Sequence, residues 1–338
     1  MEATASPKSS AAADRREDRE RFESFVKDWE HRLRTDGKAH KTILIYGGAA
    51  RALGDFLAET DRPLGVRAIG GKDVDAYINH LRQVGRSAST VHQHAKSLDL
   101  FFRWLAAEDE LPADRLPTRS IKVPQPEPAP PDVLTEEETR KLVAACQIGP
   151  SKFANRRDEA IVRMFEGSGM RLAELAGLRV EDVEIDGDRP HANVTGKGAG
   201  RGPRARTVAI SPEAANAVRR YRRERALHEQ SAQPELWLGT GYGKKDDPRR
   251  LRDVDDASLA ASGIGQIIAR RGQQAGVSVH PHQVRHTFAH RWLARGGSEG
   301  GLMKQMGWHD RSMLDRYGAS AASDRSLDEY QRLFGKKR

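Results

Sequence analysis

The sequence has little of what several large classes of protein depend on. It contains one cysteine, Cys146, in 338 residues, which excludes a disulfide framework and nearly excludes a cysteine-based zinc site. No apolar run approaches the roughly 20 residues that a membrane-spanning helix needs. The N-terminus also lacks the apolar core of a secretory signal. We therefore expect a soluble, cytoplasmic protein that has no membrane partner.

Motifs for nucleotides and metals are missing as well. The sequence has no Walker loop and no cluster of carboxylates in a metal-binding arrangement. His282, His286 and His290 are spaced four residues apart and would share one helical face, as zinc ligands of a metalloprotease do. The residue after His282 is Gln283, however, which cannot supply the general base of an HExxH motif. We expect neither a metal ion nor another cofactor.

What the sequence has in excess is positive charge. Its 57 Lys and Arg residues against 48 Asp and Glu residues give a net charge of +9 and a pI of about 9.7. This balance favours a polyanionic partner, either nucleic acid or an anionic surface. Between residues 197 and 225, nine Lys or Arg accompany two acidic residues. A basic hairpin and helix there would suit a DNA backbone; the alternative is a solvated helix face without a partner.

The spacing of apolar residues divides the chain into domains. Residues 1–14 are small and polar, and we expect them to form a disordered tail. Over residues 15–116, apolar positions recur at three- and four-residue spacing in four successive segments, which predicts a helical domain with Ser89 as the N-cap of its fourth helix. Residues 117–133 contain six prolines, which cannot continue a helix and predict an extended linker.

The second domain, residues 134–338, is expected to be mainly α-helical with a small antiparallel sheet. Thr135 and Glu138 form a capping box at the start of its first helix. The glycine-rich stretch GKGAGRGPRA predicts a hairpin loop between the last two strands. The expected strands are 183–185, 191–195 and 206–210. Further helices are expected at 212–228, 264–276, 282–295, 302–306 and 326–334.

Several side chains in this domain suit phosphate chemistry. Arg171 stands at the start of a helix, where backbone N–H groups and a guanidinium together bind phosphate well, and Glu174 would orient it one turn later. Alone, such a pair is usually a solvated ion pair. Lys197, in a TGKG turn, would donate a proton to a leaving oxygen or would be an ordinary surface lysine. His282 and Arg285 add a proton carrier and a bidentate phosphate ligand.

The C-terminal region adds a candidate nucleophile. Trp308 lies in a GWHD turn and Tyr317 follows nine residues later; each alone would be interpreted as a core residue. A tyrosine hydroxyl becomes a nucleophile once a neighbouring group activates it. Farther on there is an apolar stripe, which would dock either on a neighbouring copy or on its own domain. The stripe consists of Leu327, Tyr330, Leu333 and Phe334.

In combination these motifs resemble a known family. GMRLAEL, TGKG, HPHQVRHTFAH, GW and Tyr317 occur in this order within about 150 residues. This is similar to the pattern Arg, Lys, His-x-x-Arg, His or Trp, and Tyr of the tyrosine recombinases, also called the phage integrase family. The resemblance covers the chain from about residue 20, because the segment with SASTVHQHAKSLDLFFRWL is similar to the core-binding (SAM-like) DNA-binding domain of that family.

The resemblance implies a site-specific recombinase that cleaves and rejoins double-stranded DNA through a 3′-phosphotyrosyl intermediate. Arg171 and Arg285 would clamp the scissile phosphate and His282 would assist proton transfer. Lys197 would protonate the departing 5′ oxygen, and Tyr317 would attack the phosphorus.

Two of the assignments have alternatives. Trp308 would occupy the position where family members have histidine or tryptophan; the nine-residue spacing to the tyrosine selects it over the neighbouring His309. Arg201 or Arg204, in the same basic hairpin, could share the role of Lys197.

The family further implies a homo-tetramer on two DNA sites, with room for an accessory DNA-bending or directionality factor. We expect the recombinase of a mobile element. Resolution of chromosome or plasmid dimers is the second interpretation and would use the same residues. A type IB topoisomerase shares similar chemistry but would not need a docking tail. A non-catalytic DNA-binding regulator is the remaining alternative, and the complete set of Arg, His-x-x-Arg and Tyr argues against it.

Overall fold

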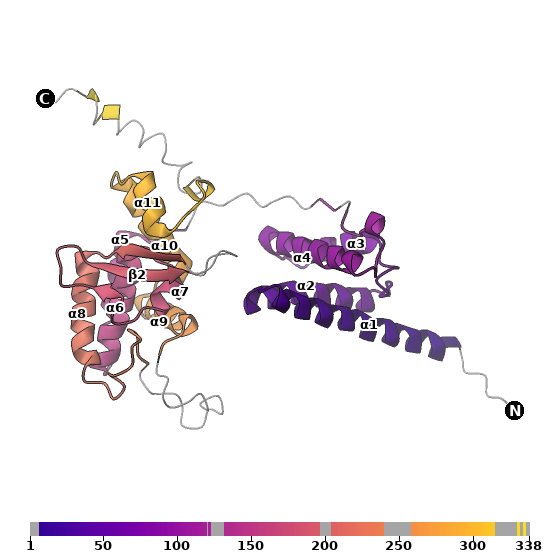
Figure 1. Ribbon diagram of the computed structural model, residues 1–338, viewed down its shortest axis with the longest axis horizontal. Coiled ribbons are helices and arrows are strands. Elements are labelled where there is room, and N and C mark those ends of the chain that lie inside the picture. Colours follow the sequence, from indigo (N-terminus) through magenta and orange to yellow (C-terminus); the bar gives the residue numbers. More distant parts are fainter. Residues whose placement is uncertain are drawn as a thin grey trace. The chain divides into compact units, whose positions relative to one another are not determined.

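The structure is a computed structural model of the chain. It describes residues 7–119, 121–122, 132–196, 204–239, 258–314, 330–331 and 334–335, with the backbone alone for residues 7–14 and 204. The chain divides into two units, Met1–Pro128 and Ala129–Arg338 (Figure 1). Each unit has its own hydrophobic core.

The described residues of the N-terminal unit form helices joined by turns, with no strand among them, as the apolar spacing predicts. Large side chains such as Trp29, Leu53, Tyr77 and Phe101 are buried between its helices. The elements are α1 (Pro7–Thr35), α2 (His40–Glu59), α3 (Gly71–Gln83), α4 (Ala88–Ala107) and the short 3-10 helix η1 (Ala113–Arg115).

Two helix starts in this unit differ from the predictions. Helix α1 begins at Pro7, inside the segment that we expected to be a disordered tail. Proline suits the first helical turn because its missing N–H needs no partner there, and the alanines that follow have the highest helix propensity. The N-cap of α4 is Ser87, whose Oγ accepts a hydrogen bond from the Thr90 N–H at 3.2 Å. Ser89 lies inside the helix, so its prediction as the cap was wrong.

The C-terminal unit is mainly helical with a small antiparallel sheet, which confirms the predicted fold class. In its described residues the strand order is β1-β2-β3, and Val194 pairs with Arg206 across the last two strands. The strands are β1 (Val183–Glu184), β2 (His191–Gly196) and β3 (Arg204–Ala209). The helices are α5 (Glu136–Ala145), α6 (Lys152–Ser168), α7 (Leu172–Ala176), α8 (Pro212–Arg225), α9 (Ala261–Ala275), α10 (Pro281–Ala294) and α11 (Glu299–Met306).

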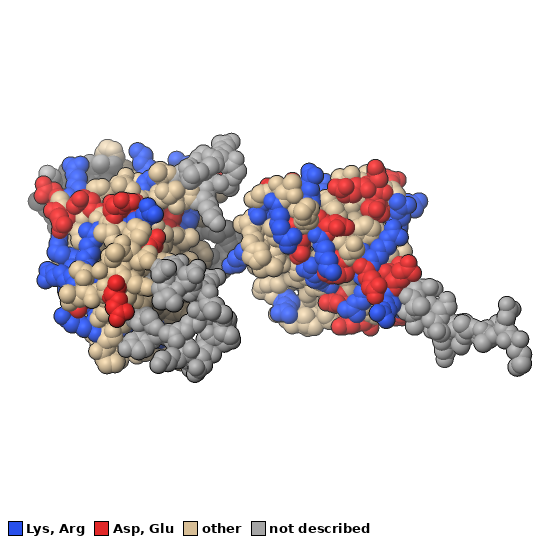
Figure 2. All heavy atoms as spheres, turned by 60° about the horizontal axis from the view of Figure 1, so that its bottom comes forward, with Lys and Arg blue, Asp and Glu red and all other residues tan. Residues whose placement is uncertain are grey.

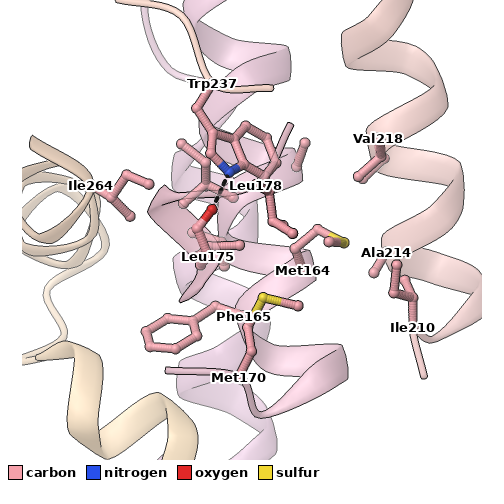
Figure 3. Packing of buried hydrophobic residues seen from close by; sticks show 14 of the residues in the cluster. Met164, Phe165, Met170, Leu175, Leu178, Ile210, Ala214, Val218, Trp237 and Ile264 are labelled. Atoms are coloured by element: carbon pink, nitrogen blue, oxygen red, sulfur yellow. Dashed lines mark hydrogen bonds between the residues drawn. The ribbon is translucent and has the colours of Figure 1, made fainter. Parts of the chain in front are cut away.

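The core of this unit lies directly beneath α7, the helix that begins after Arg171. Met170 and Leu175 are fully buried on either side of the helix start, beside Phe165 (Figure 3). The indole N–H of Trp237 donates to the Leu175 carbonyl at 2.7 Å. These contacts fix a helix of five residues, which would be too short to be stable alone.

The predicted capping box at the start of α5 is present. The Thr135 hydroxyl accepts a hydrogen bond from the Glu138 N–H at 3.1 Å, and the Glu138 carboxylate accepts one from the Thr135 N–H at 2.8 Å. Cys146, at the other end of α5, is buried, and burial raises the pKa of its thiol to about 12. Such a thiol is a poor nucleophile.

Three predicted segments fall largely outside the described residues: the proline-rich linker, 117–133, the hairpin loop GKGAGRGPRA and the last helix, 326–334. Their boundaries stay predictions. Within the part of the chain that the structure describes, no helix is long and apolar enough to cross a membrane.

Candidate active site

The site is organised around the turn that follows α11. The Nη2 atom of Arg171 donates to the Gly307 carbonyl at 3.0 Å, and Nη2 of Arg285 donates to the Met306 carbonyl at 2.6 Å. Because these carbonyls belong to successive residues, the two guanidinium groups meet at one short segment, although Arg171 is the N-cap of α7 and Arg285 lies within α10. The structure thus brings together the two arginines that the sequence analysis selected.

Glu174 holds Arg171 from the other side. Its carboxylate accepts hydrogen bonds from the Arg171 backbone N–H at 2.7 Å and from Nη1 at 2.9 Å. The Glu174 side chain is only 3% exposed, so the pair is not the solvated ion pair that helical spacing alone would favour, whereas the Arg171 side chain is 47% exposed. The hydrogen bonds of the Arg171 guanidinium to described residues use two of its five N–H donors. The other donors can bind an anionic ligand.

Glu174 remains ionised in this position. Burial by itself would raise the pKa of the carboxyl, but hydrogen bonds from Arg206 and from the Arg171 backbone outweigh burial and lower the pKa to about 2. Arg206 reaches the carboxylate through Nη1 at 2.6 Å and Nη2 at 2.8 Å. A fixed negative charge therefore lies beneath Arg171.

Arg285 is enclosed by the turn and by Trp308. Its Nη1 atom donates to the Gly169 carbonyl at 2.5 Å, and its Cζ atom lies 6.0 Å from the centroid of the Trp308 ring. Trp308 is buried, whereas the neighbouring His309 is exposed. The cluster in which Trp308 packs also contains Ala289, Leu293, Leu302, Met306 and Leu314.

His282 lies in the first turn of α10, next to Pro281 and close to the N-cap His280. It is exposed, and its ring centroid is 6.2 Å from that of His286. Among the residues that the structure describes, no group of three or more His, Cys, Asp or Glu side chains is placed to hold a metal ion.

Comparison with known proteins decides the family. The model of the phage integrase family matches residues 132–324, and the model of the N-terminal SAM-like domain of phage integrases matches residues 25–111. The chain belongs to the phage integrase family.

The relatives within this family are recombinases. The chain is 29% identical over 292 residues to tyrosine recombinase XerA of Thermococcus kodakarensis, covering 86% of this chain and 89% of the relative. It is 27% identical over 244 residues to tyrosine recombinase XerD of Bifidobacterium longum, covering 69% and 71%. The family match and these relatives make the chain a tyrosine site-specific recombinase.

Solved structures share the fold. A lambda integrase dimer bound to a COC′ core site matches with a TM-score of 0.64 and 16% identity, covering 88% of this chain and 94% of that one. The XerH site-specific recombinase bound to its difH substrate matches with a TM-score of 0.65 and 15% identity, covering 91% and 83%. At these identities the likeness concerns the fold alone.

Two residues of the family pattern lie outside the described residues: Lys197 and Tyr317. Lys197 follows directly on Gly196, the last residue of β2. Tyr317 comes three residues after Leu314, which is buried in the Trp308 cluster. The roles of both residues stay predictions.

The C-terminal apolar stripe is described in part. Tyr330 is 61% exposed and Phe334 is 70% exposed, with their ring centroids 5.1 Å apart. Leu327 and Leu333 lie outside the described residues, and whether the stripe docks on its own domain or on another copy stays open.

The arginine-rich helix α8 uses much of its charge within the protein. Arg220 pairs with Glu159, Arg222 donates to two backbone carbonyls, and Arg225 donates to four. Burial lowers the pKa of Arg222. These three arginines are engaged within the protein, so the expectation of a solvated face is wrong for them. The expected DNA contact of the hairpin and helix stays a prediction, because residues 197–203 lie outside the described residues and Arg223 is exposed. The backbone carbonyls that accept hydrogen bonds from Arg222 and Arg225 belong to Val180, Val183, Ser231, Gln233, Glu235 and Leu236.

On the face of the N-terminal unit that is visible in Figure 2, the positive charge does not form one continuous basic surface. Figure 2 shows Lys and Arg interspersed with Asp and Glu over the visible face of the N-terminal unit. On this face the charge pattern alone does not mark where a polyanion would bind.

Two residues that no motif of the sequence singles out, Arg206 and Gln305, hold the turn in place. The Gln305 amide donates to the carbonyls of Ser168 and Ala209, both at 2.9 Å, and so ties α11 to α6 and β3. Arg206 carried a detectable signal. It lies two positions before the buried Val208 in β3, on the face where an apolar residue would be expected.

Proposed function

We propose that this recombinase cleaves and rejoins double-stranded DNA through a covalent 3′-phosphotyrosyl intermediate formed by Tyr317. The observation that supports this best is the convergence of Arg171 and Arg285 on the carbonyls of Gly307 and Met306. Two fixed guanidinium groups at one turn suit a phosphate whose charge rises during in-line attack.

The proposed chemistry needs each residue in a definite role. The hydroxyl of a free tyrosine has a pKa of about 10 and is mostly protonated at neutral pH, and two nearby arginines favour the phenolate. Tyr317 then attacks the phosphorus while the 5′ oxygen leaves and takes a proton from Lys197. His282, exposed at the start of α10, accepts the phenolic proton and binds a phosphate oxygen.

Trp308 would support the clamp by packing. Its ring covers Arg285, and it would exclude water from one side of that guanidinium. The phosphotyrosyl bond conserves the energy of the broken phosphodiester, so the free 5′ hydroxyl, or one from a second duplex, can reverse the reaction without ATP.

We propose resolution of chromosome or plasmid dimers as the biological role, in place of the mobile-element role. The chain matches the tyrosine recombinases XerA and XerD over most of its length. We take this similarity to Xer recombinases as support for the dimer-resolving interpretation. Four copies would assemble on two sites, as family membership implies.

A covalent-capture assay tests the reaction. The binding site would first be selected from a random DNA library with Tyr317→Phe, then placed in a nicked duplex that loses its 5′ fragment after cleavage. Wild type and the matched control Tyr330→Phe, a tyrosine that is 61% exposed, should both give a covalent band on a denaturing gel. Tyr317→Phe should bind the duplex and give none. Binding without any band in wild type would favour the non-catalytic regulator.

A plasmid with two directly repeated copies of the selected site tests the role. A dimer-resolving enzyme should convert it into two circles, and the selected sequence should match a single chromosomal or plasmid site. A match to the two ends of a mobile element would favour the integrase instead.

A further inference from the structure

Arg206 is an arginine at an inward-facing position of a strand. The alternation of β3 places it on the same face as Val208, which is 0% exposed, and Ile210, which is 5% exposed. The Arg206 side chain itself is only 17% exposed. A charge so placed needs a partner, because removing it from water without one is costly.

Its partner is the carboxylate that holds Arg171. Nη1 and Nη2 of Arg206 grip Glu174 at 2.6 and 2.8 Å, the two-pronged geometry that gives arginine–carboxylate pairs their directionality. The Nε atom points to the Gln305 carbonyl, at 3.4 Å. Arg206 therefore joins strand β3 to helix α7 through Glu174 and to helix α11 through Gln305.

Without Arg206, the buried Glu174 would keep one counter-charge among the described residues, Arg171. A carboxylate that is 3% exposed would then either take up a proton or draw the Arg171 guanidinium inward. Either change would release Arg171 from the geometry in which Nη1 rests on Glu174 and Nη2 on the Gly307 carbonyl.

We propose that Arg206 is a positioning residue for strand cleavage, which fixes the Glu174 carboxylate so that Arg171 presents its guanidinium to the scissile phosphate. The inference rests on the proposed function. Arg206 does not itself touch the phosphate; its effect passes through Glu174 and Arg171.

The test compares single-turnover formation of the covalent adduct on the nicked duplex. Arg206→Gln should slow cleavage by about 10- to 100-fold, the range expected when a catalytic group is misplaced, while affinity for the same DNA changes less than about twofold. Arg206→Lys should recover part of the rate, because an ammonium keeps the charge but not the two-pronged contact. The matched control is Arg219→Gln, which removes an arginine that pairs with the exposed Asp186. With the duplex saturated by protein, so that any change in affinity has no effect, it should form the adduct at the wild-type rate.

A double-mutant cycle separates positioning from mere stabilisation. If Arg206 acts through Arg171, then Arg206→Gln combined with Arg171→Lys should cleave no more than about threefold slower than Arg171→Lys alone. Two defects that multiply in full would show that Arg206 acts by another route and would overturn the inference. If Arg206→Gln does not fold, Arg206→Lys takes its place in the same cycle.

The adduct assay distinguishes an error in the inference about Arg206 from an error in the proposed function. Absence of the adduct in wild type on its selected site would overturn the proposed function and the inference with it. An active wild type beside an Arg206→Gln variant of equal rate would overturn the inference alone.

Discussion

At the scale of single residues, two glycines shape the site. Gly169 and Gly307 end α6 and α11 in the left-handed conformation, with φ of 63° and 62°. Their carbonyls accept the hydrogen bonds of Arg285 and Arg171. The arginine positions therefore depend on backbone conformations that residues with a Cβ adopt only with strain.

Gly307→Ala should reduce both stability and cleavage. The left-handed φ would cost about 1 kcal/mol, and the new Cβ would lie 2.8 Å from Cζ of Arg206. The matched control is Gly276→Ala, which has φ of 66° and open space around its Cβ. Urea unfolding should show a loss in both variants, and adduct formation should fall in Gly307→Ala alone. Equal cleavage by both would contradict the proposed dependence.

Glu174 should give stability a defined pH dependence. The pKa of its carboxyl is lowered from 4.5 to about 2, so its contribution is complete above pH 4.5 and is lost as the pH falls toward 2. Glu174→Gln should destabilise the protein by about 3 kcal/mol at neutral pH, and the difference from wild type should shrink only below pH 4.5. Unfolding free energies from pH 7 down to 3 would measure this; a difference that shrinks already between pH 7 and 5 would contradict it.

At the scale of elements, α10 carries both His282 and Arg285 and is tied to the start of the C-terminal unit. Gln283 donates to Asp132 at 2.9 Å, and the Leu134 N–H donates to the Thr287 hydroxyl at 2.8 Å. These two hydrogen bonds attach α10, the helix of the proposed His282 and Arg285 roles, to the segment that follows the predicted linker.

Thr287→Val should test this attachment. Thr287 is 2% exposed, and valine has nearly the same shape without a hydroxyl. The buried Leu134 N–H would lose its partner, at a cost of about 1–3 kcal/mol. Thr207→Val removes an exposed hydroxyl that bonds Asn193 and should change stability by less than about 0.5 kcal/mol. Chemical denaturation of both variants decides the point, and equal losses would show that the attachment is unimportant.

At the scale of the whole molecule, the net charge of +9 predicts binding dominated by phosphate contacts. Part of that charge is unavailable, because Arg220, Arg222 and Arg225 are held by internal partners. We therefore expect most DNA contacts to come from other basic residues.

The affinity of Tyr317→Phe for its selected site should depend steeply on salt. If roughly 6–10 phosphates are contacted, affinity should fall roughly 10³- to 10⁵-fold between 50 and 200 mM salt. Fluorescence anisotropy with labelled duplex would measure the slope, and Arg222→Gln, although it weakens the fold, should leave that slope unchanged. A shallow slope for the parent variant would argue against a DNA backbone partner.

The sequence by itself determined the features that depend on nearby residues. The helices follow from apolar spacing, and the Thr135 capping box follows from a separation of three residues that helical geometry brings together. Arg171 and Glu174 were paired by the same rule. The family motifs and their order could be recognised in the sequence because each motif consists of a few neighbouring residues.

The tertiary structure decided what lies between distant segments. Only the fold shows that Arg206 reaches Glu174 across 32 positions, and that Arg171 reaches the Gly307 carbonyl across 136. Only the fold turns Arg222 and Arg225 of α8 inward to backbone carbonyls. Pattern cannot supply these contacts, because a backbone carbonyl carries no residue identity and long-range partners are chosen by how the helices and the sheet pack around the shared core.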